Sequence, residues 1–346
     1  FKKTWIHKGT LNMLLISFGT RPEWIKIKPI VDEIEGEIPY KILFTGQHTS
    51  LVEEYLEDTF ILNDIDDGDN RLDSIVCSLL NRDSIFEDIT HVLVQGDTTS
   101  AFAVGLAAFH RNIPVIHLEA GLRTYDNQNP YPEEFNRTAL TALATIHLCP
   151  TKDSSKNLIP TMQVDDKIYS PGNTVLDNLR GMEPEVQDKV LVTMHRRENH
   201  ENIKEWFEEI NKIAKDYPEL EFMMPLHPNP NVVRHKDILT EVRVVDPLSH
   251  AECIEFIRTC KTIITDSGGI QEESSFFKKK CIVCRKITER KEGIGVFAFM
   301  CPSPQDLSNV FDGIINKGEF LVDEECPYGD GLAAQYIKNI FIREGV

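Results

Sequence analysis

The stretch LLISFGTRPEWIKIKPIVDEI, residues 14–34, joins a short apolar run to a longer segment through a turn that contains glycine. An apolar run of this length predicts a buried strand. Proline soon after Gly-Thr-Arg is typical of a first helical turn, so the remainder predicts a helix that ends near Ile34. The same order returns at 40–45, 91–95 and 113–118. Strands that alternate with helices in this way predict a parallel sheet with helices on both faces.

The rest of the first half extends this pattern. An acidic helix is predicted around Leu51–Leu56 and another at Ala101–His110, and apolar runs at 145–149 and 167–170 predict two more strands. Since the segment before residue 12 does not begin with Met, residues 1–11 are set aside as an extension.

The second half starts the pattern afresh. Residues 202–215 have helical periodicity, with Ile203, Trp206 and Ile210 on one face. Short strands are predicted at 189–193, 222–225, 242–246, 262–265 and 281–284. We therefore predict an α/β protein with two Rossmann-like, doubly wound domains in tandem.

Glycine, proline and acidic residues cluster at 172–188 and indicate the domain boundary. The predicted domains are 12–175 and 176–330, the second of them binding UDP. Residues 331–346 form a C-terminal helix able to pack back on the N-terminal domain.

Length and composition agree with two soluble domains. The chain has 346 residues, 41% hydrophobic and 27% charged. The formal net charge of −18 argues against nucleic acid as a partner. No apolar run approaches the ~20 residues that span a bilayer, so no membrane contact is expected. Eight cysteines are widely spaced, which suits reduced thiols and a cytoplasmic location.

Cys281 and Cys284 form a C-x-x-C pattern, which can indicate a redox or zinc site. No second pair stands at zinc-ligand spacing, and the surrounding residues are typical of a short buried strand. We favour the buried strand.

Ligands of doubly wound domains bind at the carboxyl ends of the strands, so the residues after each strand, and the cleft between the two domains, form the expected site. Several of these residues can bind an anion. Arg21 and Lys26 follow the first strand, and Ser267 opens a Ser-Gly-Gly turn before a helix. Glu273, on that helix, could accept from ribose hydroxyls.

His195 and Arg196 follow the strand at 189–193, and His227 follows the strand at 222–225. Each feature has a plainer alternative: a surface ion pair for Arg21, a helix cap for Ser267, a solvated charge cluster at 195–197 and a proline-stiffened loop after His227.

Acidic residues gather after strands of the first domain. Asp97 and Glu119 each end a strand, and Glu133 and Glu134 are predicted on a nearby loop. Two like charges close together raise the pKa of one of them, which suits general acid–base chemistry. A divalent metal is the alternative. We disfavour it, because the opposing cations could already neutralise a diphosphate.

Together these segments strongly resemble the non-hydrolysing UDP-N-acetylglucosamine 2-epimerases, from about Leu14 to the last helix. The matching segments are FGTRPEWIK (18–26), TGQH (45–48), QGDTTSA (95–101), HLEAGLRT (117–124), YPEEFNR (131–137), GNTVLDNL (172–179), HRREN (195–199), HPNPNV (227–232) and TDSGGIQEE (265–273).

The resemblance implies a glycosyltransferase-B type fold, a homodimer, no metal and no cofactor. It also implies reversible epimerisation at carbon 2 of a UDP-N-acetylamino sugar, through elimination of UDP to a 2-acetamidoglucal and re-addition. The catalytic residues it implies are Asp97, Glu119, Glu133 and His195. The UDP-sugar-binding residues it implies are Arg21, Lys26, Arg137, Asn173, Arg196, His227, Ser267, Gly268, Gly269 and Glu273.

Two departures from the family pattern leave questions open. Lys286 and Lys291 stand where relatives have an acidic residue and a proline, so the sugar could be GlcNAc or a 6-deoxy analogue. Arg71 is followed by Leu72 rather than Gln, so activation by a second UDP-GlcNAc is in question.

The alternatives are a hydrolysing epimerase that releases ManNAc and UDP, a UDP-sugar-dependent glycosyltransferase and a silent UDP-sugar sensor. A dinucleotide-dependent dehydrogenase is disfavoured, because no G-x-G-x-x-G follows the first strand.

Overall fold

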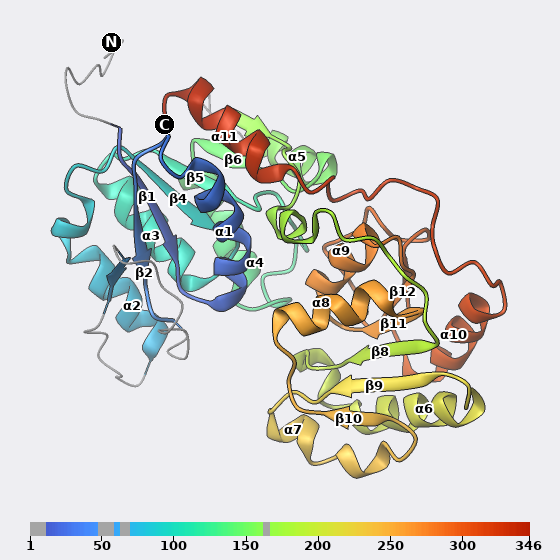
Figure 1. The fold of residues 1–346 in the computed structure, drawn as a ribbon. Coiled ribbons are helices and arrows are strands. Elements are labelled where there is room, and N and C mark those ends of the chain that lie inside the picture. The colour runs from blue at the N-terminus through green and yellow to red at the C-terminus, as the bar shows by residue number, and fades with distance from the viewer. Residues whose placement is uncertain (1–11, 48–58, 63–69, 162–166) are drawn as a thin grey trace. The chain divides into compact units, whose positions relative to one another are not determined.

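The computed structural model describes residues 12–47, 59–62, 70–161 and 167–346. The chain divides into two compact units (Figure 1). Unit 1 comprises residues up to Asn178 together with Gly331–Val346, and unit 2 comprises Leu179–Asp330. The predicted helix at 51–56 lies outside the described residues.

Unit 1 is built on a parallel seven-stranded sheet with the order β3-β2-β1-β4-β5-β6-β7. The order reverses direction at β1, as in doubly wound sheets. The strands are β1 (Leu14–Phe18), β2 (Tyr40–Phe44), β3 (Thr59–Ile61), β4 (His91–Gln95), β5 (Val115–Leu118), β6 (Ile146–Leu148) and β7 (Lys167–Tyr169). The helices are α1 (Arg21–Ile34), α2 (Arg71–Leu80), α3 (Thr99–His110), α4 (Glu133–Leu143), α5 (Lys152–Leu158) and α11 (Ala333–Glu344).

Side chains of β1 alternate between the two faces of this sheet, as the two-residue period of a strand requires. Ile16 belongs to the core that also contains residues of α1 and α11, whereas Leu15 belongs to the core with α2 and α3. Helix α11 contributes Ile337 and Phe341, both fully buried. Burying one such side chain contributes roughly 1.5–3 kcal/mol, so the last helix is an integral part of unit 1.

Unit 2 is built on a parallel six-stranded sheet with the order β10-β9-β8-β11-β12-β13. The strands are β8 (Lys189–Thr193), β9 (Glu221–Pro225), β10 (Arg243–Val245), β11 (Thr262–Thr265), β12 (Cys281–Val283) and β13 (Ala298–Met300). The helices are α6 (Ile203–Asp216), α7 (Pro230–Val233), α8 (His250–Thr259), α9 (Gly268–Phe276) and α10 (Leu307–Ile315). Aromatic side chains fill its core, among them Trp206, Phe222 and Phe311.

Two parallel sheets with interleaved helices confirm the predicted fold class. The placement of Glu133 and Glu134 on a loop was wrong, because both lie in the first turn of α4. Pro130 and Pro132 gave the segment the composition of a turn. Pro132 instead stands directly before the helix, where acidic residues interact favourably with the helix dipole.

The C-x-x-C segment is a buried strand, as favoured above. Cys281 and Cys284 are fully buried and all eight cysteines are free. Burial raises the pKa of the Cys281 thiol to about 11, which is the opposite of an activated thiolate.

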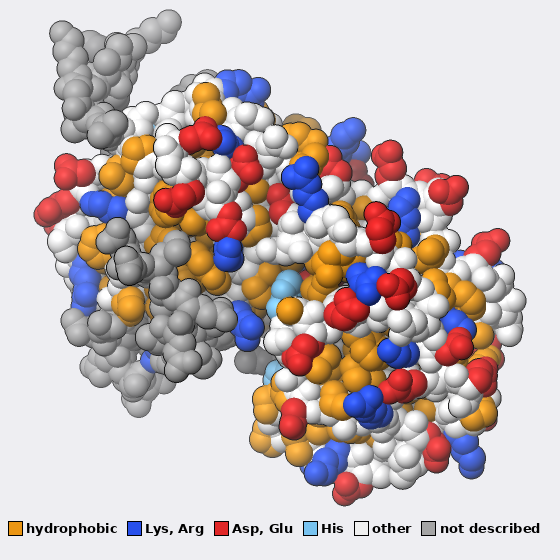
Figure 2. All heavy atoms as spheres, in the orientation of Figure 1, with side chains coloured by type: hydrophobic (Ala, Val, Ile, Leu, Met, Phe, Trp, Pro, Cys, Tyr) orange, Lys and Arg blue, Asp and Glu red, His pale blue; other side chains and the backbone are white. Residues whose placement is uncertain are grey.

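On the face shown in Figure 2, acidic and basic side chains are interspersed rather than gathered by sign. In the part of the chain that the structure describes, no helix has both the length and the apolar character needed to cross a membrane.

Candidate functional site

The candidate carboxylates of unit 1 follow neighbouring strands. β4 and β5 pair in parallel, with Gln95 opposite Leu118. Asp97 comes two residues after β4 and Glu119 directly after β5. The shared sheet edge therefore carries both side chains, as the sequence predicted.

Glu119 is held in an uncommon conformation. Its φ of 64° lies in the left-handed region, which costs a residue other than glycine on the order of 1–3 kcal/mol. Its side chain is 8% exposed and accepts from Lys26 Nζ at 2.6 Å. Gln95 Nε2 also donates to it. Four other non-glycine residues of the described chain, Asp88, Asn112, Tyr125 and Lys278, also have a positive φ. It is therefore this conformation together with the ion pair at a strand end that marks Glu119 as a site residue.

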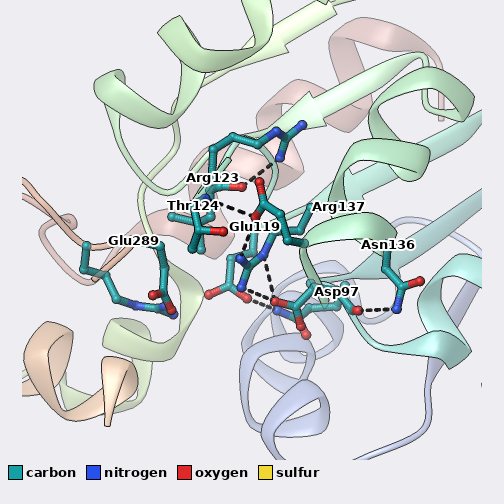
Figure 3. Close-up of polar contacts among 12 residues, drawn as sticks. Asp97, Glu119, Arg123, Thr124, Asn136, Arg137 and Glu289 are labelled. Atoms are coloured by element: carbon teal, nitrogen blue, oxygen red, sulfur yellow. Dashed lines mark hydrogen bonds and ion pairs between the residues drawn. The ribbon is translucent and has the colours of Figure 1, made fainter. Parts of the chain in front are cut away.

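Asp97 has a different basic partner, Arg137 of α4 (Figure 3). Arg137 Nε donates to the Asp97 carboxylate at 2.9 Å, and Asn136 Nδ2 donates to the Asp97 carbonyl at 2.8 Å. The sequence argument treated Asp97 and Glu119 as a like-charged pair. The structure instead pairs Glu119 with Lys26 and Asp97 with Arg137.

Glu133 begins α4, and its Oε2 atom is buried without a hydrogen-bond partner among the described residues. Leaving a buried acceptor unpaired costs free energy. Glu134, by contrast, accepts from the backbone N–H groups of Thr124 and Tyr125 and from Arg137. Of the two, Glu133 is therefore the one with a carboxylate oxygen that lacks a hydrogen-bond partner among the described residues.

In unit 2 the central side chain is Asp266, which the sequence analysis did not single out. It is fully buried and accepts from the backbone N–H groups of His195 at 2.9 Å and Arg196 at 2.8 Å. Asn199 Nδ2 also donates to it, at 3.0 Å. The sequence signal that could have revealed it is an aspartate directly after an apolar run that predicts a strand. Asp266 fixes the whole segment that carries His195.

His195 is stacked on His227, with ring centroids 5.5 Å apart and an interplanar angle of 19°. Its Nδ1 atom lies 3.3 Å from Asp266 Oδ1. Burial lowers the pKa of His195, and the attraction of Asp266 opposes that shift. The imidazole is therefore predominantly neutral near neutral pH.

We expect the ring of His195 to titrate below the ordinary histidine value of about 6.5, as measured by the pH dependence of its NMR chemical shifts. As the pH falls below 6.5, His195 is protonated in the unfolded chain while it is still mostly neutral in the folded protein. His195 therefore lowers the free energy of unfolding in acid. In Asp266→Asn, which lacks the opposing charge, titration should move lower still. A midpoint above 6.5 in the unsubstituted protein would contradict the role given to burial.

The Ser-Gly-Gly turn forms the start of α9. Ser267 stands at the cap position of α9, as the plainer alternative had it, but its side chain makes no capping hydrogen bond. A Cβ added at Gly268 would lie 2.8 Å from Arg290 Nη1. Arg290 is itself held by Glu272 and Glu289, so Gly268 allows a fixed guanidinium to approach the helix start.

The remaining predicted binding residues differ in their surroundings. Arg21 is exposed at the start of α1, and His227 is exposed after β9. Asn173 is buried and accepts from the Val175 N–H. Glu273 Oε1 lies 3.0 Å from His250 Nε2. The Nε atom of Arg196 is buried with no hydrogen-bond partner in the described part of the chain.

The predicted residues thus form one group in each unit. Unit 1 brings together Lys26, Asp97, Glu119 and Arg137 through ion pairs. Unit 2 places His195, Arg196 and Ser267 around the ends of β8 and β11. Among the residues that the structure describes, no group of three or more His, Cys, Asp or Glu side chains could hold a metal ion.

Comparison with known proteins assigns the chain to a family. The family model for UDP-N-acetylglucosamine 2-epimerase matches residues 32–342. The UDP-N-acetylglucosamine 2-epimerase of Neisseria meningitidis serogroup A is 36% identical over 95% of this chain and 99% of its own length.

Solved structures agree. The crystal structure of the N. meningitidis UDP-GlcNAc 2-epimerase bound to UDP-GlcNAc has a TM-score of 0.84 at 34% identity, covering 96% of this chain and 100% of that one. A UDP co-structure of S. aureus MnaA has a TM-score of 0.85 at 29% identity, covering 97% of each chain. With its doubly wound sheets and the matching motifs at their strand ends, the chain belongs to the UDP-N-acetylglucosamine 2-epimerase family.

Proposed function

We propose that this protein interconverts UDP-GlcNAc and UDP-ManNAc by eliminating UDP and adding it back. The observation that carries the proposal is the strained Glu119, ion-paired to Lys26 beside the Asp97–Arg137 pair at one edge of the sheet. A similar protein crystallised with UDP-GlcNAc supports the choice of substrate.

The proposed reaction has two stages. One carboxylate of the set Asp97, Glu119 and Glu133 removes the proton from carbon 2 while the bond between carbon 1 and the diphosphate oxygen breaks. This yields a 2-acetamidoglucal and UDP. Another carboxyl group of the set then returns a proton to the opposite face of carbon 2 as UDP adds back to carbon 1.

Removal of a weakly acidic proton becomes feasible because the charge leaves on the diphosphate. Preorganised cations and N–H donors stabilise such a developing charge better than water does. We assign this role to Arg21, His195, Arg196, Ser267, Gly268 and Gly269. The uncapped Ser267 hydroxyl and the unpaired Arg196 Nε support this assignment, since both have hydrogen-bonding capacity to spare.

The other assignments complete the proposed site. Glu273 accepts from the ribose hydroxyls, and His227, Asn173 and Arg137 complete the binding of the UDP-sugar. Lys26, predicted to contact phosphate, is proposed also to hold the Glu119 carboxylate in place through their ion pair.

Lys286 and Lys291, the first departure from the family pattern, are both exposed. Buried side chains of the same loop form ion pairs, including Arg285 with Glu289 at 3.0 Å. The substitutions therefore leave the buried framework of this loop intact, and UDP-GlcNAc is the first sugar to test, before its 6-deoxy analogues.

The test is incubation with UDP-GlcNAc in heavy water, followed by proton NMR. We expect a second UDP-sugar with deuterium at carbon 2, without added metal or nicotinamide cofactor. Free UDP in stoichiometric amount would support hydrolysis instead, and absence of turnover with both UDP-GlcNAc and its 6-deoxy analogues would contradict the proposal. The homodimer and the independence from cofactors stay predictions from the family resemblance, and the cytoplasmic location stays a prediction from the widely spaced cysteines.

A further inference from the structure

Glu23 is a buried acid that the reaction proposed above does not use. It lies in the first turn of α1 and is 2% exposed. Its Oε2 atom accepts from the Gly19 N–H at 2.9 Å and from the Thr20 hydroxyl at 2.8 Å. Its Oε1 atom accepts from the Thr98 hydroxyl at 2.7 Å. Burial raises the pKa of Glu23, and these hydrogen bonds oppose the shift.

These contacts join two loops that are distant in the sequence. Gly19 and Thr20 link β1 to α1, whereas Thr98 directly follows Asp97 after β4. Thr98 also caps α3, since its hydroxyl accepts from the Ala101 N–H at 3.1 Å. The Glu23 carboxylate therefore links the loop that carries Asp97 to the start of α1.

The surrounding contacts leave this junction little freedom. A Cβ added at Gly19 would lie 2.4 Å from Ser100 Oγ and 2.5 Å from Thr45 Oγ1, so the two loops pack closely. On its other side, the Asp97 loop is anchored by His117 Nε2, which lies 2.7 Å from the Gly96 carbonyl oxygen. Burial lowers the pKa of His117 to about 3, so this ring is neutral and its Nε2 carries the donated hydrogen.

We propose that Glu23 is a positioning residue for the epimerisation. Through its hydrogen bond with Thr98, the Glu23 carboxylate fixes the position of the Asp97 loop relative to α1, the helix that carries Lys26. The inference rests on the proposed function of the site. Its physical basis is that proton transfer depends steeply on placement, since a shift of about 1 Å can lower a rate roughly 100-fold.

The test compares Glu23→Gln and Thr98→Val, singly and together. Glutamine is nearly isosteric but cannot accept from the loops on both of its terminal atoms, and valine keeps the shape of Thr98 without its hydroxyl. We expect each single variant to lower kcat about 10-fold while KM and UDP affinity change less than about twofold, because the substrate-binding groups are untouched. The double variant should be little worse than either single variant, since both break the same link.

The controls separate positioning from general stability. Asp32→Asn alters an exposed acid on the same helix and should leave kcat unchanged, and Thr98→Ser, which retains the hydroxyl, should restore most of the rate. Rates are expressed per UDP-binding site, so partly unfolded protein does not lower them. Should Glu23→Gln fold poorly, Thr98→Val against Thr98→Ser gives the same comparison.

Normal kcat per site in Glu23→Gln and Thr98→Val, or losses that multiply in the double variant, would overturn the role of Glu23 alone, provided that the unsubstituted protein epimerises UDP-GlcNAc. An unsubstituted protein that binds UDP but epimerises no UDP-sugar would overturn the proposed function, and this role with it.

Discussion

Glu119→Gln is expected to lower kcat for the epimerisation of UDP-GlcNAc by at least about 100-fold, the scale of a lost proton-transfer group. Glutamine preserves the shape of the side chain but can neither take nor return a proton, and it leaves Lys26 without the carboxylate that lies 2.6 Å away. UDP affinity should stay nearly unchanged, because the proposed diphosphate contacts come from other residues. The rate is measured by proton NMR and the affinity by calorimetry.

Asp97→Asn and Glu133→Gln should show losses of the same order, since the reaction needs one group to remove the proton and another to return it. Glu87→Gln, at an exposed position of the same unit, serves as the matched control and should retain full activity. Near-normal turnover in all three site variants would rule out this set of carboxylates as the proton-transfer groups.

Asp266→Ala is expected to destabilise unit 2 by several kcal/mol, since each buried donor left without an acceptor costs about 1–3 kcal/mol. The side chain is fully buried, and its removal leaves the N–H groups of His195 and Arg196 and the amide of Asn199 without their acceptor. Urea unfolding measures the loss of free energy. UDP binding should also weaken, because the segment with His195 and Arg196 loses its anchor.

Asp266→Asn provides the comparison, since it keeps the volume and one acceptor oxygen. We expect a smaller loss of stability and partial retention of UDP binding in this variant. If Asp266→Ala unfolded at the same urea concentration as the unsubstituted protein, the segment at 195–199 would have to be held by contacts other than this carboxylate.

Sequence patterns were enough to predict the fold where strands are short, apolar and central. The runs at 91–95, 189–193 and 262–265 correspond to β4, β8 and β11 with the same bounds. Other elements were missed. The edge strand β13 covers only Ala298–Met300, which is too short for a sequence pattern to identify. Helix α10 was overlooked although Leu307, Phe311 and Ile314 share one buried face at helical spacing.

The candidate site was predicted as a set of residues but not as a set of contacts. Arg21, Ser267 and His195 could be found because each follows a strand. The partners could not, since Lys26 meets Glu119 and Thr98 meets Glu23 across long stretches of chain. Such pairings depend on which strands become neighbours in the sheet, and local sequence carries no record of that order.

The return of α11 to unit 1 bears on how this protein is made. During synthesis the amino-terminal unit emerges first, yet α11, which contributes Ile337 and Phe341 to its core, is translated only after all of unit 2. Until then, one face of the nascent sheet exposes apolar surface to the cell, the kind of surface that aggregates or recruits chaperones. The two units thus cannot mature strictly one after the other, because a helix translated after unit 2 completes the core of unit 1.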